Sequence, residues 1–257
     1  MVASHLSAAV LLSALISLAG AAPTETVSID KRAQVLAAGT SPVSSNLPDY
    51  GLLFRASGYL AKGDCPASVG ITTCYVARLS SKPNENLDND IGGTDTYTQS
   101  NFVTTGALEA TGAITEFTFK YFIGPALKTP SPYEMKLVQV VSKEPVADGS
   151  LTKVWLDIRN NKAGIYAFDE TNPVVSIPLS SFTGKTTVHT WIFKGGNEGY
   201  VDIDIKDAAT GISILKHREN RPSTRDSYRF RIGAIRSVKE NPYPYLTYFG
   251  DYTAQIM

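Results

Sequence analysis

Apolar and polar residues alternate along most of the chain in short runs, which end at glycine, asparagine, aspartate or proline. The clearest run is Glu116–Ile123 (EFTFKYFI), which is followed by Gly124-Pro125. A period of two residues predicts β-strands that turn one face towards a core. The other predicted strands are Glu134–Ser142, Leu151–Arg159, Ile165–Phe168, Val174–Leu179, Thr186–Phe193, Gly199–Lys206, Ile212–His217, Tyr228–Val238 and Leu246–Gln255. No segment has the period of a long amphipathic helix, so the chain is predicted to be all-β, as a sandwich or a barrel.

Several predicted strands carry aromatic, arginine and aspartate side chains on one face, where lysine, glutamate or threonine would be more usual. The sets that share a face are Trp155, Asp157 and Arg159; Arg229 and Arg231; and Leu246, Tyr248, Gly250 and Tyr252. Aromatic rings stack on sugar rings, and the polar groups beside them bind hydroxyl or carboxylate groups. We interpret these faces as carbohydrate-binding surfaces, with ordinary half-exposed strand residues as the alternative.

The first residues have the pattern of a secretion signal. The apolar run Ala8–Leu18 is too short to span a bilayer as a helix, and the small residues Ala19-Gly20-Ala21-Ala22 follow it. The dibasic pair Lys31-Arg32 is typical of a processing site of fungal secretory proteases. We therefore expect a secreted, extracellular protein with a signal peptide at residues 1–22, a pro-segment at 23–32 and one all-β domain at 33–257. A buried amino-terminal helix is the alternative for the apolar run.

The chain has two cysteines, Cys65 and Cys74, which are close in sequence. In an oxidising compartment such a pair is predicted to form one disulfide that closes a short loop. No histidine lies near them, so we expect no metal site there. We also expect no cofactor, because the sequence lacks the glycine-rich motifs that bind nucleotides and dinucleotides.

The 24 basic and 24 acidic residues give a formal net charge of zero, and the basic residues form no block. We therefore expect neither nucleic acid nor an anionic membrane surface as a partner, and we expect a monomer. The polar segment Ser80–Thr98 is predicted to be a loop, either functional or a simple surface excursion.

Two stretches near the carboxyl terminus resemble the concanavalin A-like jelly-roll polysaccharide lyases, which include alginate lyases, glucuronan lyases and the heparin lyase I type. Thr187–Leu215 is similar to a pair of strands of that family. Tyr245–Gln255 (YLTYFGDYTAQ) is similar to the last core strand of alginate lyases, Tyr-Phe-Lys-Ala-Gly-Val-Tyr-Asn-Gln. With Gly250 on the family glycine, Tyr252 falls on the catalytic tyrosine and Tyr248 on the lysine. The resemblance implies a β-jelly-roll sandwich of two antiparallel sheets.

The resemblance also implies β-elimination from a uronic-acid polysaccharide. In that reaction a polar or basic group neutralises the C6 carboxylate, a base removes the C5 proton, and an acid protonates the leaving glycosidic oxygen. The predicted catalytic residues are Tyr252, Gln139 and Arg159, and the predicted substrate-binding residues are Tyr248, Trp155, Arg229 and Arg231. The expected partner is a polysaccharide that contains uronic acid.

The sequence also departs from the alginate lyase pattern. In Lys136–Ser142 (KLVQVVS), Gln139 matches the glutamine of the motif Gln-Ile/Val-His, but Val141 stands in place of the histidine. The motif Arg-x-Glu-Leu-Arg has no counterpart, and we interpret His189 as a structural residue. A non-catalytic, lectin-like carbohydrate-binding protein on the same scaffold is therefore the alternative. An exported effector or wall-associated structural protein is a third interpretation.

Overall fold

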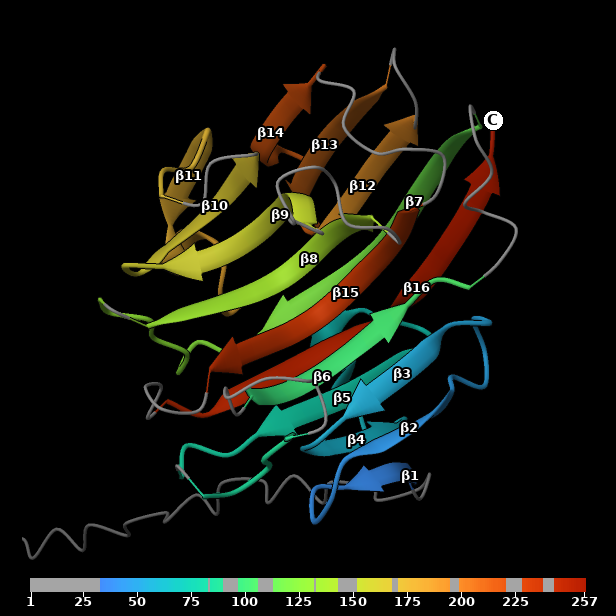
Figure 1. Ribbon diagram of the computed structural model, residues 1–257, viewed down its shortest axis with the longest axis vertical. Helices are drawn as coiled ribbons and strands as arrows, with labels where there is room; N and C mark the ends of the chain where they lie inside the picture. The colour runs from blue at the N-terminus through green and yellow to red at the C-terminus, as the bar shows by residue number, and fades with distance from the viewer. Residues whose placement is uncertain are drawn as a thin grey trace, which may run out of the picture. The chain divides into compact units, whose positions relative to one another are not determined.

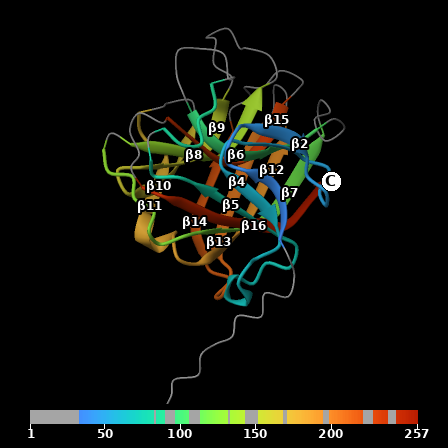
Figure 2. The ribbon, with the colours of Figure 1, turned by 90° about the horizontal axis from the view of Figure 1, so that it is seen from below.

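The computed structural model describes residues 33–257 apart from 83, 90–96, 106–112, 132, 143–151, 168–170, 195–198, 221–227 and 238–242. The predicted signal peptide and pro-segment lie outside these residues. The described part consists mainly of β-strands, with short 3₁₀ turns at Ala67–Val69 (η1) and Leu179–Ser181 (η3) and no α-helix. Figure 1 and Figure 2 show this arrangement in two perpendicular views.

The strands form two antiparallel sheets, each with eight strands within the described residues. In spatial order, sheet A contains β1 (Gln34–Ala38), β4 (Tyr59–Lys62), β5 (Cys74–Leu79), β16 (Tyr245–Ile256), β7 (Ile114–Ile123), β12 (Thr186–Lys194), β13 (Tyr200–Asp207) and β14 (Ser213–Glu219). Sheet B contains β11 (Val175–Pro178), β10 (Lys162–Ala167), β9 (Thr152–Arg159), β8 (Glu134–Ser142), β15 (Tyr228–Ser237), β6 (Tyr97–Val103), β3 (Leu53–Ala56) and β2 (Val43–Asn46). Figure 1 shows the strands of sheet B in front of those of sheet A.

One hydrophobic core lies between the two sheets. Aromatic rings join them: Phe117 of β7 stacks on Phe230 of β15 with ring centroids 4.3 Å apart. Phe249 of β16 stacks on Phe102 of β6 at 4.6 Å. Such rings bury large apolar areas and dominate the energy of a core. Residues that alternate with these core positions point away from the core, so each sheet has an outer face that is free to carry function.

The strands predicted from alternation are present where the structure describes them. The prediction for Glu134–Ser142 matches β8, and the prediction for Leu151–Arg159 matches β9 from Thr152 onward. The alternation predicts no individual strands before Glu116, where β1 to β6 are only four to seven residues long. Runs of that length hold too few alternating positions to be distinguished from loops. The described part has the jelly-roll sandwich that was predicted.

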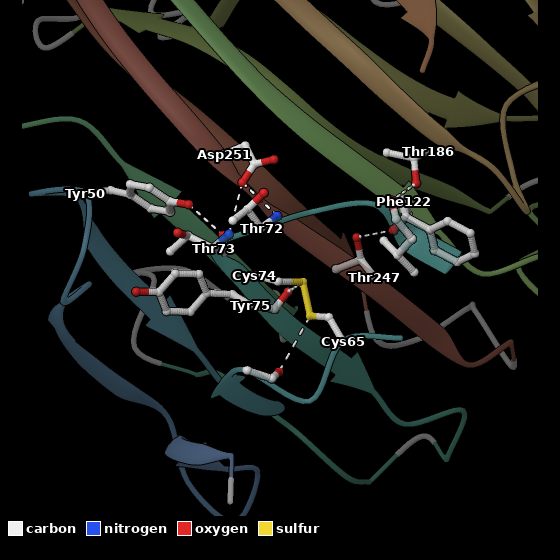
Figure 3. The surroundings of a disulfide bond; sticks show 12 residues. Tyr50, Cys65, Thr72, Thr73, Cys74, Tyr75, Phe122, Thr186, Thr247 and Asp251 are labelled. Atoms are coloured by element: carbon white, nitrogen blue, oxygen red, sulfur yellow. Dashed lines mark hydrogen bonds between the residues drawn. A yellow bond between two sulfur atoms is a disulfide. The ribbon is translucent and has the colours of Figure 1, made fainter. Parts of the chain in front are cut away.

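Cys65 and Cys74 form the predicted disulfide. The loop that it closes lies beside β16, as Figure 3 shows. Asp251 of β16 holds the end of this loop, because its Oδ1 accepts hydrogen bonds from the backbone N–H groups of Thr72 at 2.9 Å and Thr73 at 3.0 Å. The disulfide and the carboxylate therefore fix the same loop from two sides.

Replacing Cys65 and Cys74 together by alanine should lower the free energy of unfolding by about 2–3 kcal/mol, because the unfolded chain regains the freedom of a short closed loop. The fold itself should persist, since Asp251 still holds the loop. Urea unfolding followed by tryptophan fluorescence measures the difference. A reducing agent should destabilise the parent protein by the same amount and leave the double variant unchanged. Equal stability of the oxidised parent and the variant would contradict this expectation.

Candidate functional site

The outer face of sheet B brings most of the predicted site residues together. Tyr166, Trp155, Gln139 and Arg231 lie directly opposite one another across β10, β9, β8 and β15. Directly opposed residues of antiparallel strands share a face. Their neighbours along each strand belong to the core, so this row of four side chains points outward. The predicted grouping of Arg229 with Arg231, and of Trp155 with Asp157 and Arg159, is confirmed.

Arg231 is a partly buried cation without a described carboxylate partner. Its Nη1 donates a hydrogen bond to Oε1 of Gln139 at 3.3 Å, and its Nε is buried without an acceptor among the described residues. Burial, helped by the charge of Arg229, lowers the pKa of the Arg231 guanidinium. Arginine nevertheless stays protonated in proteins. A desolvated cation with an unused N–H group is costly unless an anion binds to it, so this position is suited to a carboxylate.

Arg229 and Gln139 lie beside the Arg231 guanidinium on the same face. Arg229 is exposed and lies opposite Val141 on the same face, where it adds a second positive charge. Gln139 is 4% exposed and presents its amide between Arg231 and Trp155. The predicted positions of Gln139, Arg229 and Arg231 are thus compatible with one binding site.

Trp155 does not offer the open stacking surface that the sequence suggested. Its ring lies parallel to that of Tyr166, with centroids 5.8 Å apart, and the ammonium of Lys136 lies 5.6 Å from its centroid. These contacts leave Trp155 only 1% exposed. The indole Nε1 is buried without an acceptor among the described residues. In this structure Trp155 supports Lys136 and Gln139 and is not itself a platform for a sugar ring.

Arg159 is less available than Arg231 for charge neutralisation. It pairs with Asp157 at 2.7 Å and with Glu134 at 3.1 Å, and its guanidinium lies 4.6 Å from the ring centroid of Tyr166. Burial raises the pKa of Asp157 to about 6, although the charge of Arg159 acts in the opposite direction. Two carboxylates therefore already compensate Arg159. The role of neutralising a substrate carboxylate fits Arg231 better.

Sequence reasoning missed a polar network on the same face. Arg55 of β3 donates two hydrogen bonds to Asp88, whose side chain is fully buried, and Gln99 of β6 donates to Asp88 as well. Asn101 in turn donates to Oε1 of Gln99. The alternation of Gln99 and Asn101 in the run YTQSNFV was the available signal. The network makes the outer face of sheet B polar across β3 and β6.

Tyr248 and Tyr252 do not share a face, and the prediction that they do is wrong. A β-bulge shifts the register of β16 against β7 between Gly250 and Thr253, and Asp251 at its centre has φ +48°. The bulge adds one residue and so reverses the side on which Tyr252 lies.

Both tyrosines are enclosed. Tyr252 belongs to the core, its hydroxyl has no hydrogen-bond partner among the described residues, and burial raises its pKa. Tyr248 packs on the outer face of sheet A against the disulfide loop, in a cluster with Cys74. Neither lies in the sheet that carries Gln139. This geometry contradicts the expectation that Tyr252 and Gln139 act in one catalytic site, with Tyr248 beside them.

A different strand fits the family pattern and adjoins Gln139. In β15 the sequence Phe230–Gly233 (FRIG) has the spacing of Phe-Lys-Ala-Gly in the alginate lyase strand. With Gly233 on the family glycine, Arg231 takes the place of the lysine and Ile235 that of the second tyrosine. β15 pairs with β8, so Arg231 and Gln139 lie side by side. In this alignment the position of the lysine is held by a cation, Arg231, whereas the position of the second tyrosine is held by the apolar Ile235.

Within the described residues, no group of three or more histidine, cysteine, aspartate and glutamate side chains is arranged to hold a metal ion. The same part of the chain contains no helix long and apolar enough to cross a membrane.

No protein-family model and no curated protein matches this chain. Among solved structures, the chain is similar to an endo-β-1,4-glucuronan lyase from the fungus Trichoderma reesei, with a TM-score of 0.57 and 14% identity, covering 86% of this chain and 96% of that one. It is also similar to an alginate lyase of polysaccharide lyase family 7, with a TM-score of 0.52 and 8% identity, covering 83% and 85% of the two chains. At these identities the likeness concerns the fold alone. The chain has the concanavalin A-like jelly-roll fold that these polysaccharide lyases share.

Proposed function

We propose that this protein binds a uronate-containing polysaccharide across the outer face of sheet B and cleaves it by β-elimination. The observation that carries the proposal is the partly buried Arg231, which contacts the amide of Gln139 and has an unused Nε–H group. A guanidinium binds a carboxylate through two parallel hydrogen bonds. Arg231 and Gln139 together would hold the C6 carboxylate of one uronate unit.

Neutralising that carboxylate prepares the sugar for elimination. As a solvent water molecule accepts the C5 proton, negative charge spreads onto the carboxylate, where Arg231 and Gln139 would stabilise it. The C4–O bond then breaks, a C4–C5 double bond forms, and the leaving oxygen takes a proton.

Lys136 is the side chain placed to donate that proton. Its ammonium lies over the ring of Trp155, and Trp155 is directly opposite Gln139. Tyr166 is three strands from Arg231, which corresponds to about 14 Å, too far to act on the same sugar unit.

Binding without cleavage is the second candidate, and a specific observation favours it. Val141 occupies the position of the family histidine and Ile235 that of the family tyrosine, so two positions that transfer protons in the family are apolar here. The carboxylate-binding pair Arg231 and Gln139 is present in either case.

One assay separates the candidates. The chain from Ala33 onward is incubated with a panel of polyuronates and with a neutral glucan, and the ultraviolet absorbance of the unsaturated product is followed alongside binding. We expect binding to a polyuronate and an absorbance rise that Lys136→Gln abolishes without loss of binding. Binding with no absorbance rise would establish the second candidate. Equal binding to the neutral glucan, or no binding at all, would overturn the proposal.

We also propose that the protein acts outside the cell as a monomer. The disulfide between Cys65 and Cys74 is of the kind that persists in oxidising compartments. The apolar run Ala8–Leu18 and the pair Lys31-Arg32 supply the pattern of export and processing. Amino-terminal sequencing of the exported protein should give a chain that begins at Ala33.

A further inference from the structure

A shallow pocket of about 340 Å³ opens on the outer face of sheet A, the sheet that does not carry Arg231. Its floor is one row of side chains in which Tyr59 of β4, Arg78 of β5 and Leu246 of β16 lie directly opposite one another. β4, β5 and β16 are neighbours in the sheet (Figure 1). The volume is at the lower end of the range for small-molecule sites, which is sufficient for one sugar unit.

Asn86 forms hydrogen bonds with two segments at the rim of this pocket. Its Oδ1 accepts a hydrogen bond from the backbone N–H of Ser80 at 2.7 Å, and its Nδ2 donates to the carbonyl oxygen of Gly39 at 2.9 Å. Asn86 has φ +59°, a conformation that asparagine tolerates better than most residues. The amide therefore joins two segments that are distant in sequence, and the wall of the pocket is preformed.

Arg78 is the charged group of the pocket. It is exposed, its guanidinium lies 5.5 Å from the ring centroid of Tyr59, and it forms no ion pair or hydrogen bond with the described residues. Arg218 offers a comparison on the same sheet. Its guanidinium lies 4.1 Å from the ring centroid of Tyr200, but it also pairs with Asp202 at 3.2 Å. Each arginine contacts one aromatic ring. Within the described residues, Arg218 is paired with a carboxylate and Arg78 is not.

We infer that this pocket is a second binding site for an acidic sugar unit, and the inference rests on the proposed polyuronate specificity. Tyr59 and Leu246 provide apolar contacts for the C–H groups of a pyranose ring. The Arg78 guanidinium can donate two parallel hydrogen bonds to the carboxylate. An apolar floor beside a cation that has no carboxylate partner within the described part of the chain is complementary to a uronate and less so to a neutral sugar.

Two sites on different sheets change how the protein holds a polymer. A short oligosaccharide binds at each site separately, whereas further units of a long chain, or of the neighbouring chains in a polysaccharide network, engage the second site at a raised effective concentration. Loss of the Arg78 site should therefore weaken binding to the polymer much more than binding of a short oligosaccharide at Arg231.

The test compares Arg78→Gln with Arg218→Gln, a control that removes a ring-contacting arginine already paired with Asp202. The probes are the polyuronate identified in the binding panel and its trisaccharide. We expect Arg78→Gln to lower the affinity for the polymer at least tenfold and to reduce trisaccharide binding from two sites to one in calorimetry. The site that remains should be lost in the double variant with Arg231→Gln. Arg218→Gln should bind like the parent.

Two failures are distinguishable in this experiment. A parent protein that binds the trisaccharide at the Arg231 site only, with unchanged polymer affinity in Arg78→Gln, would overturn the second site and leave the proposed function intact. A parent protein that binds no polyuronate would overturn both. Equal losses in Arg78→Gln and Arg218→Gln would show a general effect of surface charge and would also overturn the second site.

Discussion

Replacing Arg231 with glutamine should weaken polyuronate binding about 100-fold while the free energy of unfolding stays the same or rises. Truncating one partner of a desolvated, hydrogen-bonded charge pair costs about 2–5 kcal/mol of binding energy, and about 1.4 kcal/mol corresponds to a factor of ten. The fold gains little from Arg231, because the guanidinium is partly desolvated and the amide of Gln139 is its only polar side-chain contact among the described residues. Removing an uncompensated cation from such a position relieves a desolvation cost.

The two readouts together separate a binding role from a structural one. Affinity is measured by calorimetry with the polyuronate, and stability by urea unfolding of the same preparations. Arg218→Gln is the matched control, since it removes the same charge from the other sheet and should change neither quantity appreciably. Parent-like affinity in Arg231→Gln would refute the assignment of the carboxylate site. A parallel loss of affinity and stability would show that Arg231 is a structural residue.

The faces of individual strands could be read from the sequence, but their pairing could not. In β9 and β15 strict alternation separates core residues from outward ones, so the shared face of Arg229 and Arg231 followed directly from the order of residues. The contact of Arg231 with Gln139 depends on the pairing of β15 with β8, two segments that are far apart in sequence. Alternation is the same whichever strands pair, and it therefore carries no information about register between them.

The face of Tyr252 was predicted wrongly because of a local bulge in β16, and residues far away in sequence stabilise that bulge. The bulge at Asp251 reverses the face of every later residue in β16. In the sequence, Gly250 is the one nearby residue typical of a turn or bulge, so the bulge could not be predicted. Asp251 adopts its positive φ where its carboxylate accepts hydrogen bonds from Thr72 and Thr73, in the disulfide loop. Contacts between residues nearly the whole domain apart thus set the side on which one aromatic ring lies.

The segment Ser80–Thr98 shows that loops, too, can depend on contacts with distant residues that the sequence pattern does not reveal. Its polar composition predicted a loop without indicating any internal residue, but Asp88 within it is fully buried and accepts hydrogen bonds from Arg55 and Gln99. A buried carboxylate is stable there because a cation and an amide satisfy it. Those partners come from β3 and β6, so composition alone could not identify Asp88 as an internal residue.

His189 should make the fold acid-labile. It is fully buried in the core, stacked on Phe119 with ring centroids 4.6 Å apart, and its Nδ1 has no hydrogen-bond partner among the described residues. Thr187 donates its hydroxyl proton to the carbonyl of Tyr121, so the oxygen of Thr187 accepts from Nε2–H of a neutral His189. Burial lowers the pKa of His189 from 6.5 to about 3. The prediction of a structural histidine agrees with this environment.

The sign of the effect follows from proton binding. Between pH 6.5 and about 3 the unfolded chain takes up a proton at His189 that the folded chain does not, so stability falls as the pH falls through this window. The loss should be on the order of 4 kcal/mol by pH 3. Asp157 acts in the opposite direction, because its raised pKa of about 6 lets the folded chain bind the extra proton between pH 6 and 4. The measured curve of the parent protein is therefore the difference of two trends.

Comparison with His189→Leu isolates the histidine. Both proteins carry Asp157, so its contribution cancels when their free energies of unfolding are subtracted at each pH. The advantage of the parent over the variant should shrink steadily from pH 7 to pH 3 in urea titrations, whatever the cost of repacking around leucine at neutral pH. That cost is independent of pH, since leucine does not titrate and the neighbouring Phe119 carries no charge. Parallel stability curves would mean that His189 takes up its proton at the same pH in the folded and the unfolded chain. The apolar surroundings of its Nδ1, which has no hydrogen-bond partner among the described residues, oppose this.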